Sequence, residues 1–347
     1  MFGLAMLASA SGPVGYERFA DSYYYLKHQF FSGVLPGLAL FALAAFVPYR
    51  AYKRYAGALF IVSIIFLILV FVPGIGTDYG TFAQSWIDLG VFSFQPAELV
   101  KLTFLLYLAA WLEGRAGELK DWQSGLIPFL ISLGVISVLM LLQPDVGTLS
   151  IIVAIAFMMY FVAGGKVSHL VGLGIFGILA FLISIQLSPY RAARFTTFLH
   201  PEFDPLGVGY QINQALLAVG SGGFFGRGYG HSLQKFQYLP EVVGDSIFAI
   251  VAEEMGFFLT ALFVFLFVAM ILRGIRIARE SKDGFGKYIV VGVMTWFGVQ
   301  AFVNIGAIIG LMPLTGVPLP FLSYGGTALT ISLVAAGIVL NVSRKNQ

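Results

Sequence analysis

The chain of 347 residues is 59% hydrophobic and only 11% charged, and its formal net charge at pH 7 is +3. Soluble domains carry about 25% charged residues, so this composition indicates a membrane protein. Cysteine is absent, which excludes disulfides and thiolate metal sites. The four histidines show no metal-ligand spacing, and a net charge this small requires no nucleic-acid partner.

Apolar runs long enough to cross a bilayer recur along the whole chain. We predict one partial span and nine fuller ones, near residues 1–10, 29–47, 57–74, 96–112, 125–143, 146–164, 169–187, 246–272, 288–311 and 326–342. Spanning strands are not expected, because they would be about 10 residues long and alternate in polarity. The run at 1–10 is about half as long as a bilayer core requires, so we expect a first helix that is truncated.

Basic residues predict the orientation, since they concentrate in short cytoplasmic loops. If both termini are cytoplasmic, most of the 20 Lys and Arg residues fall inside, for example Lys53, Arg115 and Arg276. We therefore predict an all-α polytopic membrane protein of about ten transmembrane helices, in a single domain over residues 1–347. A large extracytoplasmic loop over residues 188–244 would join the seventh and eighth helices.

This loop leads to Asp245, at the mouth of the span over 246–272. A carboxylate beside an apolar span is costly, so an ionisable group there is a functional-site hypothesis. The alternative is that Asp245 only caps the helix that follows, which is a common role for aspartate.

Other ionisable groups interrupt the apolar pattern. Glu98 and Lys101 are three residues apart, so they share a helix face and can pair, for either a structural or a functional purpose. Asp145 follows a proline in a tight turn, where it can cap the next helix or line a cavity. Glu253 and Glu254 are adjacent, and we expect both to be structural, with at least one paired or protonated.

The loop has internal order of its own. Residues 210–219 read as an amphipathic helix on the membrane surface, with apolar positions at Ile212, Leu216 and Val219. The glycine-rich segment 221–230 follows, and with Arg227 and Lys235 it could receive a diphosphate. Further on, the proline-rich segment 313–327 should break the helix and wall the same outer pocket.

Five long motifs in order resemble one family: FQPAELVKL, QPDVGT, GYQINQALLAVGSGGFFGRGYG, KFQYLPEVVGDSIFAIVAEEMGF and PLTGVPLPFLSYGG. Together they resemble the SEDS family of bacterial shape, elongation, division and sporulation proteins (RodA, FtsW and SpoVE). The N-terminal region looks more like the division branch, FtsW, whereas residues 84–90 look more like the elongation branch, RodA.

The resemblance implies a peptidoglycan glycosyltransferase that polymerises lipid II at the outer face of the plasma membrane, with Asp245 as the catalytic residue. The chain departs from the family pattern in two places: Ser85 stands where the family often has arginine, and Gly244 and Ser246 flank the aspartate where the family often has threonine and phenylalanine. The residues expected to support catalysis or bind substrate are Glu98, Lys101, Asp145, Arg194, Arg227, Lys235, Glu241, Ser323 and Tyr324.

The implied reaction is an inverting transfer in which Asp245 acts as general base and undecaprenyl diphosphate leaves. Arg194, Arg227, Lys235 or a divalent cation (Mg²⁺ or Mn²⁺) would stabilise the diphosphate. The expected partners are a class B penicillin-binding protein and other membrane proteins of the division or elongation machinery. The alternatives are a lipid II flippase or other transporter, and a non-catalytic scaffold for the penicillin-binding protein.

Overall fold

The computed structural model of the chain describes residues 1–77, 85–88, 90, 93–115, 117–187, 189–200 and 207–346. Parts of the predicted loop, residues 188 and 201–206, and part of the RodA-like segment at 84–90 lie outside these described residues. The helices of the first half are α1 (Phe2–Phe19), α2 (Tyr24–Gln29), a π-helical segment (Phe30–Val34), α3 (Leu35–Phe46), α4 (Tyr49–Leu69), α5 (Pro96–Gly114), a second π-helical segment (Trp122–Leu126), α6 (Ile127–Leu142) and α7 (Val146–Val162).

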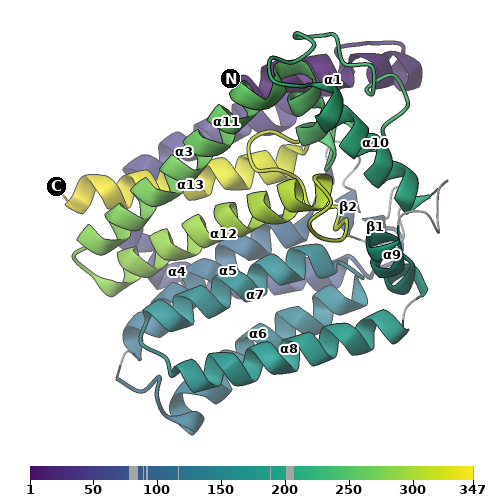
Figure 1. Ribbon diagram of the computed structural model, residues 1–347. Helices are drawn as coiled ribbons and strands as arrows, with labels where there is room; N and C mark the ends of the chain where they lie inside the picture. The colour runs from purple at the N-terminus through teal and green to yellow at the C-terminus, as the bar shows by residue number, and fades with distance from the viewer. Residues whose placement is uncertain are drawn as a thin grey trace. The chain divides into compact units, whose positions relative to one another are not determined.

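The second half is also helical where it is described (Figure 1). Its helices are α8 (Val167–Leu187), α9 (Pro189–Leu199), α10 (Val208–Ser221), α11 (Ile247–Glu280), α12 (Gly284–Ile308) and α13 (Gly326–Asn346). Each predicted apolar run therefore coincides with a helix. Within the described residues, six helical stretches are long and apolar enough to cross a membrane: Tyr24–Phe46, Tyr49–Leu69, Trp122–Leu142, Ile247–Glu280, Gly284–Ile308 and Gly326–Lys345. The total of ten spans and the side on which the loop lies stay predictions.

Three local features differ from the predicted pattern. Helix α1 continues to Phe19 instead of ending near residue 10, because buried Ser11 and Gly15 pack inside the protein and outweigh the weak helix propensity of this stretch. Strands β1 (Gly76–Thr77), β2 (Trp86–Asp88) and β3 (Ser93–Phe94) form a small antiparallel sheet between α4 and α5. Helix α9 lies within the predicted loop.

The chain divides into two compact units, each made from three stretches of sequence. The second unit contains residues 32–172, 270–299 and 326–347. Within it, α3 and α13 approach closely at glycines: a Cβ on Gly37 would lie 3.2 Å from the Thr330 backbone, and one on Gly337 would lie 2.6 Å from the Phe41 carbonyl oxygen. Small residues at such crossings allow close van der Waals packing between helices in a membrane, where the hydrophobic effect provides little force.

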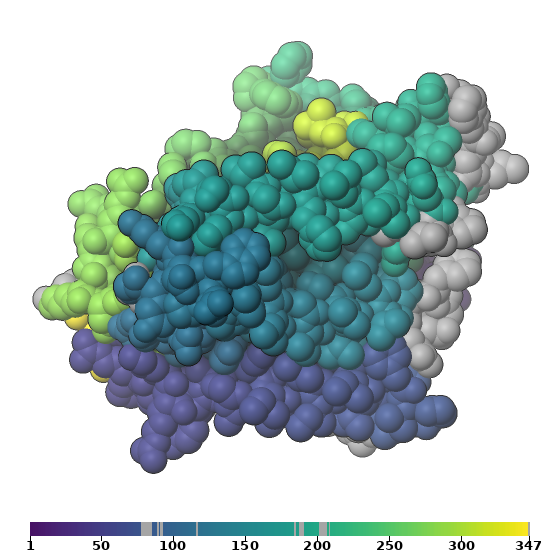
Figure 2. Space-filling model, turned by 90° about the horizontal axis from the view of Figure 1, so that it is seen from below, coloured from purple at the N-terminus to yellow at the C-terminus, as the bar shows by residue number. Residues whose placement is uncertain are grey.

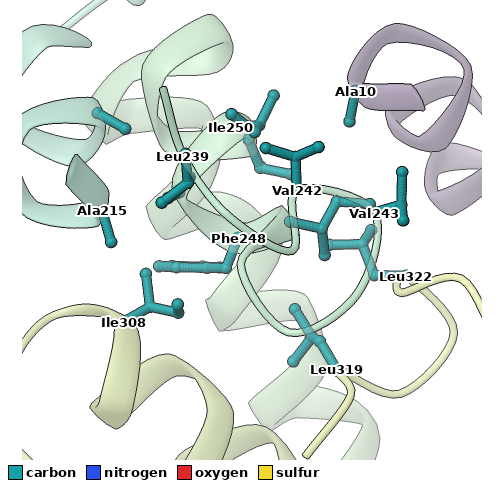
Figure 3. Close-up of a cluster of buried hydrophobic side chains, with 14 of the residues drawn as sticks. Ala10, Ala215, Leu239, Val242, Val243, Phe248, Ile250, Ile308, Leu319 and Leu322 are labelled. Carbon is teal, nitrogen blue, oxygen red and sulfur yellow. The ribbon is translucent and has the colours of Figure 1, made fainter. Parts of the chain in front are cut away.

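The first unit contains residues 1–31, 173–269 and 300–325, and it has a continuous apolar core. Figure 3 shows how this core gathers side chains from segments that are distant in sequence. Those labelled are Ala10 of α1, Ala215 of α10, Leu239, Val242 and Val243 of the loop, Phe248 and Ile250 of α11, Ile308 of α12, and Leu319 and Leu322. The loop before α11 is therefore folded into the core of this unit.

Helix α8 presents large apolar side chains to the surface, and its residues form the teal band that crosses the face shown in Figure 2. Phe176 is 69% exposed and Ile178 is 62% exposed. A helix with large apolar side chains on its exposed face suits a lipid environment, in agreement with the composition.

Candidate active site

Asp245 lies two residues before the start of α11, at the end of a series of turns that leads from α10. Its side chain is partly exposed, although protein atoms surround most of it. Asp245 Oδ1 accepts hydrogen bonds from Gln211 Nε2 of α10 and from Ser246 Oγ, each at 3.4 Å. Within the described residues, no N–H of the first turn of α11 donates to this carboxylate, so its contacts are not those of a helix cap.

Charges around Asp245 act in opposite directions. Burial raises the pKa of the Asp245 carboxyl to about 6, and the negative charge of Glu241 adds to the rise. The positive charge of Arg194 and the hydrogen bond from Ser246 oppose it. A carboxylate with a pKa near the working pH is suited to take a proton during a reaction.

Two segments hold the backbone at Asp245 from the other side. Asn304 of α12 is buried, and its Nδ2 donates to the carbonyl oxygens of both Asp245 and Val317, each at 2.8 Å. Ser323 Oγ donates to the Gly244 carbonyl oxygen at 2.7 Å, and the Tyr324 N–H donates to the Val243 carbonyl oxygen at 2.8 Å. The predicted break before α13 is confirmed, and the segment joins the loop that carries Asp245.

The predicted residues Glu241 and Arg194 reach the same site from different elements. Glu241 is exposed, with φ 53, a left-handed conformation that non-glycine residues rarely adopt. Its carbonyl oxygen accepts from the N–H groups of Gly244 (3.0 Å) and Ser246 (3.1 Å), which shapes the turn at Asp245. Arg194 of α9 donates from Nη1 to the Leu314 carbonyl oxygen at 3.1 Å. The structure thus brings Asp245, Glu241, Arg194, Ser323 and Tyr324 together in the first unit.

The ammonium group of Lys235 bonds to groups inside the protein and does not face solvent. Its side chain is 4% exposed, and Nζ donates to Glu254 Oε1 (2.9 Å), Ser9 Oγ (3.0 Å) and the Gly230 carbonyl oxygen (2.8 Å). These three acceptors match the three protons of an ammonium group. We therefore assign Lys235 a structural role and correct the expectation that it faces a diphosphate.

The adjacent carboxylates are both buried and both paired, in agreement with their predicted structural role. Glu254 accepts from Lys235 and Ser9, while Glu253 accepts from Ser232 Oγ at 2.5 Å and from the Leu233 N–H at 3.0 Å. Arg227 Nε lies 3.6 Å from Glu253 Oε1, and the Arg227 side chain is 36% exposed. Glu253 thus neutralises part of the positive charge of Arg227.

The amphipathic helix predicted at 210–219 is present as α10, and part of its surface packs into the core of the first unit. Ile212, Ala215 and Ala218 are buried, whereas Leu216 is 42% exposed. Alanines at the contact allow α10 to approach the core more closely than leucine would, and Leu216 turns outward. The expectation that this helix lies on the membrane surface stays a prediction.

Glu98 and Lys101 belong to the second unit, where they form the predicted pair. Lys101 Nζ lies 2.8 Å from Glu98 Oε1, and the two side chains are 1% and 2% exposed. The ammonium also lies 4.8 Å from the centre of the Trp296 ring. Among the described residues, Glu98 Oε2 has no hydrogen-bond partner, so the pair is buried with one acceptor unsatisfied.

Asp145, also in the second unit, caps α7. Its Oδ1 accepts from the Thr148 N–H at 2.9 Å, which confirms the predicted capping interaction. Glu98 and Asp145 belong to one unit and Asp245 to the other, so the shared site expected for these three residues stays a prediction.

The described residues contain no group of three or more His, Asp or Glu side chains that could hold a metal ion. At the site, Asp245 and Glu241 provide two carboxylates. Mg²⁺ keeps several waters and often shares its coordination with substrate phosphates, so two carboxylates do not form a dedicated protein cage. The divalent cation stays a prediction.

Gln211 and Asn304 are the site residues that the sequence analysis missed. Asn304 lies within the apolar run at 288–311, and a polar side chain in a spanning segment is a signal that could have been followed. Gln211 is less visible, because a polar residue on an amphipathic helix is ordinary.

The fold and the site define a polytopic helical membrane protein with a carboxylate of raised pKa at the mouth of one helix. The family profile described as "Cell cycle protein", for FtsW, RodA and SpoVE, matches residues 1–347. The chain therefore belongs to the FtsW/RodA/SpoVE family, which confirms the resemblance read from its motifs.

Named relatives agree with the profile. Stage V sporulation protein E of Bacillus subtilis (strain 168) is 40% identical over 342 residues, which are 99% of this chain and 93% of the relative. "Probable peptidoglycan glycosyltransferase FtsW" of Geobacter sp. (strain M18) is 40% identical over 345 residues, with the same coverage of 99% and 93%.

Solved structures share the fold. A chain from a structure titled "Structural coordination of polymerization and crosslinking by a peptidoglycan synthase complex" has a TM-score of 0.79 and 30% identity, with 100% of this chain and 98% of that chain covered. The rod shape determining protein RodA of Thermus thermophilus has a TM-score of 0.69 and 29% identity, with 100% and 97% covered.

Proposed function

We propose that this protein is a peptidoglycan glycosyltransferase that polymerises lipid II into glycan strands at the outer face of the bacterial plasma membrane. The carrying observation is Asp245, a carboxylate of raised pKa held at the end of a loop that α10, α12 and the segment before α13 fix in place. Relatives named as peptidoglycan glycosyltransferases, 40% identical in the case of the Geobacter protein, support the activity.

In the proposed reaction Asp245 is the general base. The acceptor sugar hydroxyl gives its proton to the Asp245 carboxylate while the hydroxyl oxygen forms a bond to the donor anomeric carbon. The bond from that carbon to the diphosphate oxygen breaks, and undecaprenyl diphosphate leaves with the electron pair. A single displacement inverts the anomeric carbon and needs no covalent enzyme intermediate. The raised pKa of Asp245 suits a group that must gain and release a proton in each cycle.

Arg194 is the cation that we assign to the leaving diphosphate. Its positive charge already acts on Asp245, so it belongs to the same site. A fixed cation stabilises charge that develops on a leaving group without reorganising at the moment of reaction. Arg227 is a weaker candidate because Glu253 partly neutralises its charge. Lys235 is not assigned to the diphosphate, because its ammonium group already donates three hydrogen bonds inside the protein.

We further propose that the chain works with a class B penicillin-binding protein in the division or elongation machinery, as a multi-pass protein with both termini in the cytoplasm. The structural neighbour whose title names a synthase complex coordinating polymerisation and crosslinking supports this partner. The expected comparison is lipid II polymerisation by the purified protein with and without that partner.

The decisive test is the variant Asp245→Asn, which keeps the shape of the side chain and removes the base. Polymerisation of lipid II in proteoliposomes should fall by a factor of about 10²–10⁴, the usual contribution of a general base. Asp121→Asn is the matched control, since it alters an exposed capping carboxylate outside the site and should retain most of the activity.

Polymerisation by Asp245→Asn at the parental rate would show that another group is the base. A lipid-scrambling assay on the same vesicles tests the flippase alternative, because scrambling without polymer would indicate transport. Retained binding of the penicillin-binding protein with no turnover by the unaltered chain would indicate a scaffold.

A further inference from the structure

The glycine-rich segment after α10, predicted from the sequence to receive a diphosphate, packs against α11 at an interruption in that helix. Gly256 interrupts α11, with φ 70 and ψ −178. A Cβ on Gly256 would lie 2.1 Å from the Gly226 nitrogen and 2.5 Å from the Phe225 carbonyl carbon. The two backbones are therefore in direct contact, and both belong to the first unit.

Four backbone hydrogen bonds join the irregular stretch of α11 to the loop. The Phe257 and Phe258 N–H groups donate to the carbonyl oxygens of Gly223 (2.9 Å) and Phe224 (3.2 Å). The Arg227 and Gly228 N–H groups donate to the carbonyl oxygens of Glu253 and Glu254, each at 3.0 Å. Each irregular segment thus supplies hydrogen-bond partners for backbone groups of the other. Non-helical backbone is tolerated at membrane depth only when protein satisfies its polar groups in this way.

The sequence of α11 places this contact at the edge of the hydrocarbon core. Residues 255–272 contain no charged side chain, and Arg273 follows them. Eighteen helical residues rise roughly 27 Å, close to the ~30 Å of a bilayer core. Gly256 is the second residue of this run, so it lies near the end opposite Arg273, at the same depth as the segment that packs against it.

The surface of this segment is aromatic and outward-facing. Phe224 is 67% exposed and Phe225 is 84% exposed. Phe224 lies 6.3 Å from Phe257 and 5.8 Å from Phe258 between ring centres, and Phe225 lies 5.6 Å from Phe258. Phe257 and Phe258 are themselves 61% and 55% exposed and belong to the candidate span of α11. The four rings form one apolar surface, which we name the aromatic patch.

The charges near the aromatic patch are neutralised inside the protein. Lys235 and Glu254 lie 2.9 Å apart and are almost fully buried, and Arg227 lies 3.6 Å from Glu253. Paired charges of this kind allow the segment to leave bulk water at lower cost than free charges would.

We propose that Phe224 and Phe225 enter the outer leaflet and contact lipid acyl chains, so that part of the predicted extracytoplasmic loop is a membrane anchor. Phenylalanine is typical of the apolar face that an interfacial segment buries at the boundary between headgroups and acyl chains, and here the rings continue the exposed apolar surface of α11. The helix between Gly256 and Ile247 rises about 14 Å, so the anchor holds Asp245 outside the hydrocarbon core, on the side where the headgroup of a lipid-linked sugar would lie. This last point rests on the proposed function, whereas the anchoring does not.

The chain has no cysteine, so a single introduced cysteine can be labelled specifically. The fluorescence of a small label attached to Phe225→Cys in lipid nanodiscs should be quenched by nitroxide-labelled lipid. Aqueous iodide should quench it less than it quenches a label at a water-exposed position. Phe265→Cys, at a position that is 66% exposed within α11, is the lipid reference. Glu118→Cys, at a position whose side chain is 57% exposed between α5 and α6, is the water reference.

Iodide quenching at Phe225→Cys as strong as at Glu118→Cys would place the segment in water and overturn the anchor. Protection from both quenchers would show that a protein surface covers the aromatic patch, and this would also overturn it. The outcome is independent of catalysis, because an active Asp245→Asn variant would refute the proposed base and leave the quenching unchanged.

Discussion

At the scale of single residues, the proposed chemistry depends on the pKa of Asp245, on which the charges of Glu241 and Arg194 act in opposite directions. Burial raises the pKa of Asp245 to about 6, Glu241 adds to the rise, and Arg194 opposes it. The neutral carboxyl is thus favoured more in the folded protein than in the unfolded chain. Between pH 3.8 and about 6 the folded state binds more protons, so the contribution of Asp245 to stability falls as pH rises through this window.

The same balance predicts a pH dependence for polymerisation. The rate should rise with pH through a midpoint of about 6, because the base must be deprotonated. Glu241→Gln should move the midpoint down, since a negative neighbour is removed, and Arg194→Gln should move it up. Rates of lipid II polymerisation from pH 4.5 to 8.5 measure both shifts, and two midpoints moving in the same direction would contradict this electrostatic account.

Sequence reasoning at this scale succeeded where partners are close along the chain. The spacing of Glu98 and Lys101 predicted their pairing, and the position of Asp145 after a proline predicted its cap. Lys235 was misread because its acceptors are remote: Ser9 lies 226 positions away and Glu254 lies 19 positions away. The sequence near a glycine-rich loop does not show which distant residues will pair with a cation there.

At the scale of elements, the interruption of α11 is the feature that the sequence concealed. An apolar run with one glycine looks like an ordinary helix, in which a glycine costs only about 1 kcal/mol relative to alanine. The four backbone hydrogen bonds that compensate for the unwound turn come from a segment with no apolar periodicity. Helix positions could be predicted from local pattern, but this contact depends on two segments meeting.

Gly256→Ala should therefore lower the thermal stability of the protein strongly. The backbone at φ 70 and ψ −178 is open only to glycine, and the added Cβ would meet three backbone atoms within 2.8 Å. Gly230→Ala is the control, because φ there is +83 and a Cβ would meet nothing within 4 Å. Thermal unfolding in detergent should show a larger loss for Gly256→Ala, and equal losses would mean that conformational strain alone accounts for both.

At the scale of the whole molecule, composition and run length predicted the class of protein and the position of each long helix. They could not predict the small sheet β1–β3, whose strands are two or three residues long, or α9 within the polar loop. Both lie in stretches where no apolar run exceeds the length of a turn. The family resemblance was decided by long motifs in order, which composition alone does not contain.

The predicted orientation can be tested on intact cells stripped of their outer layers. An impermeant maleimide should label Tyr238→Cys, since this side chain is 56% exposed in the predicted outer loop. Lys282→Cys, exposed between α11 and α12, should be labelled only after the membrane is opened, because basic loops remain cytoplasmic. Labelling of Lys282→Cys before permeabilisation would reverse the assigned topology.

Asn304 affects which side of the proposed site can move when product leaves. One amide nitrogen donates to the carbonyl oxygens of both Asp245 and Val317, so the two chain segments on that side are joined through Asn304. Gln211, by contrast, reaches the carboxylate at 3.4 Å from a separate helix, and this is the longer and weaker contact. If Asp245 is the proposed base, we expect product to leave on the side of α10, where the contact to the carboxylate is long, while the backbone on the side of Asn304 keeps its position.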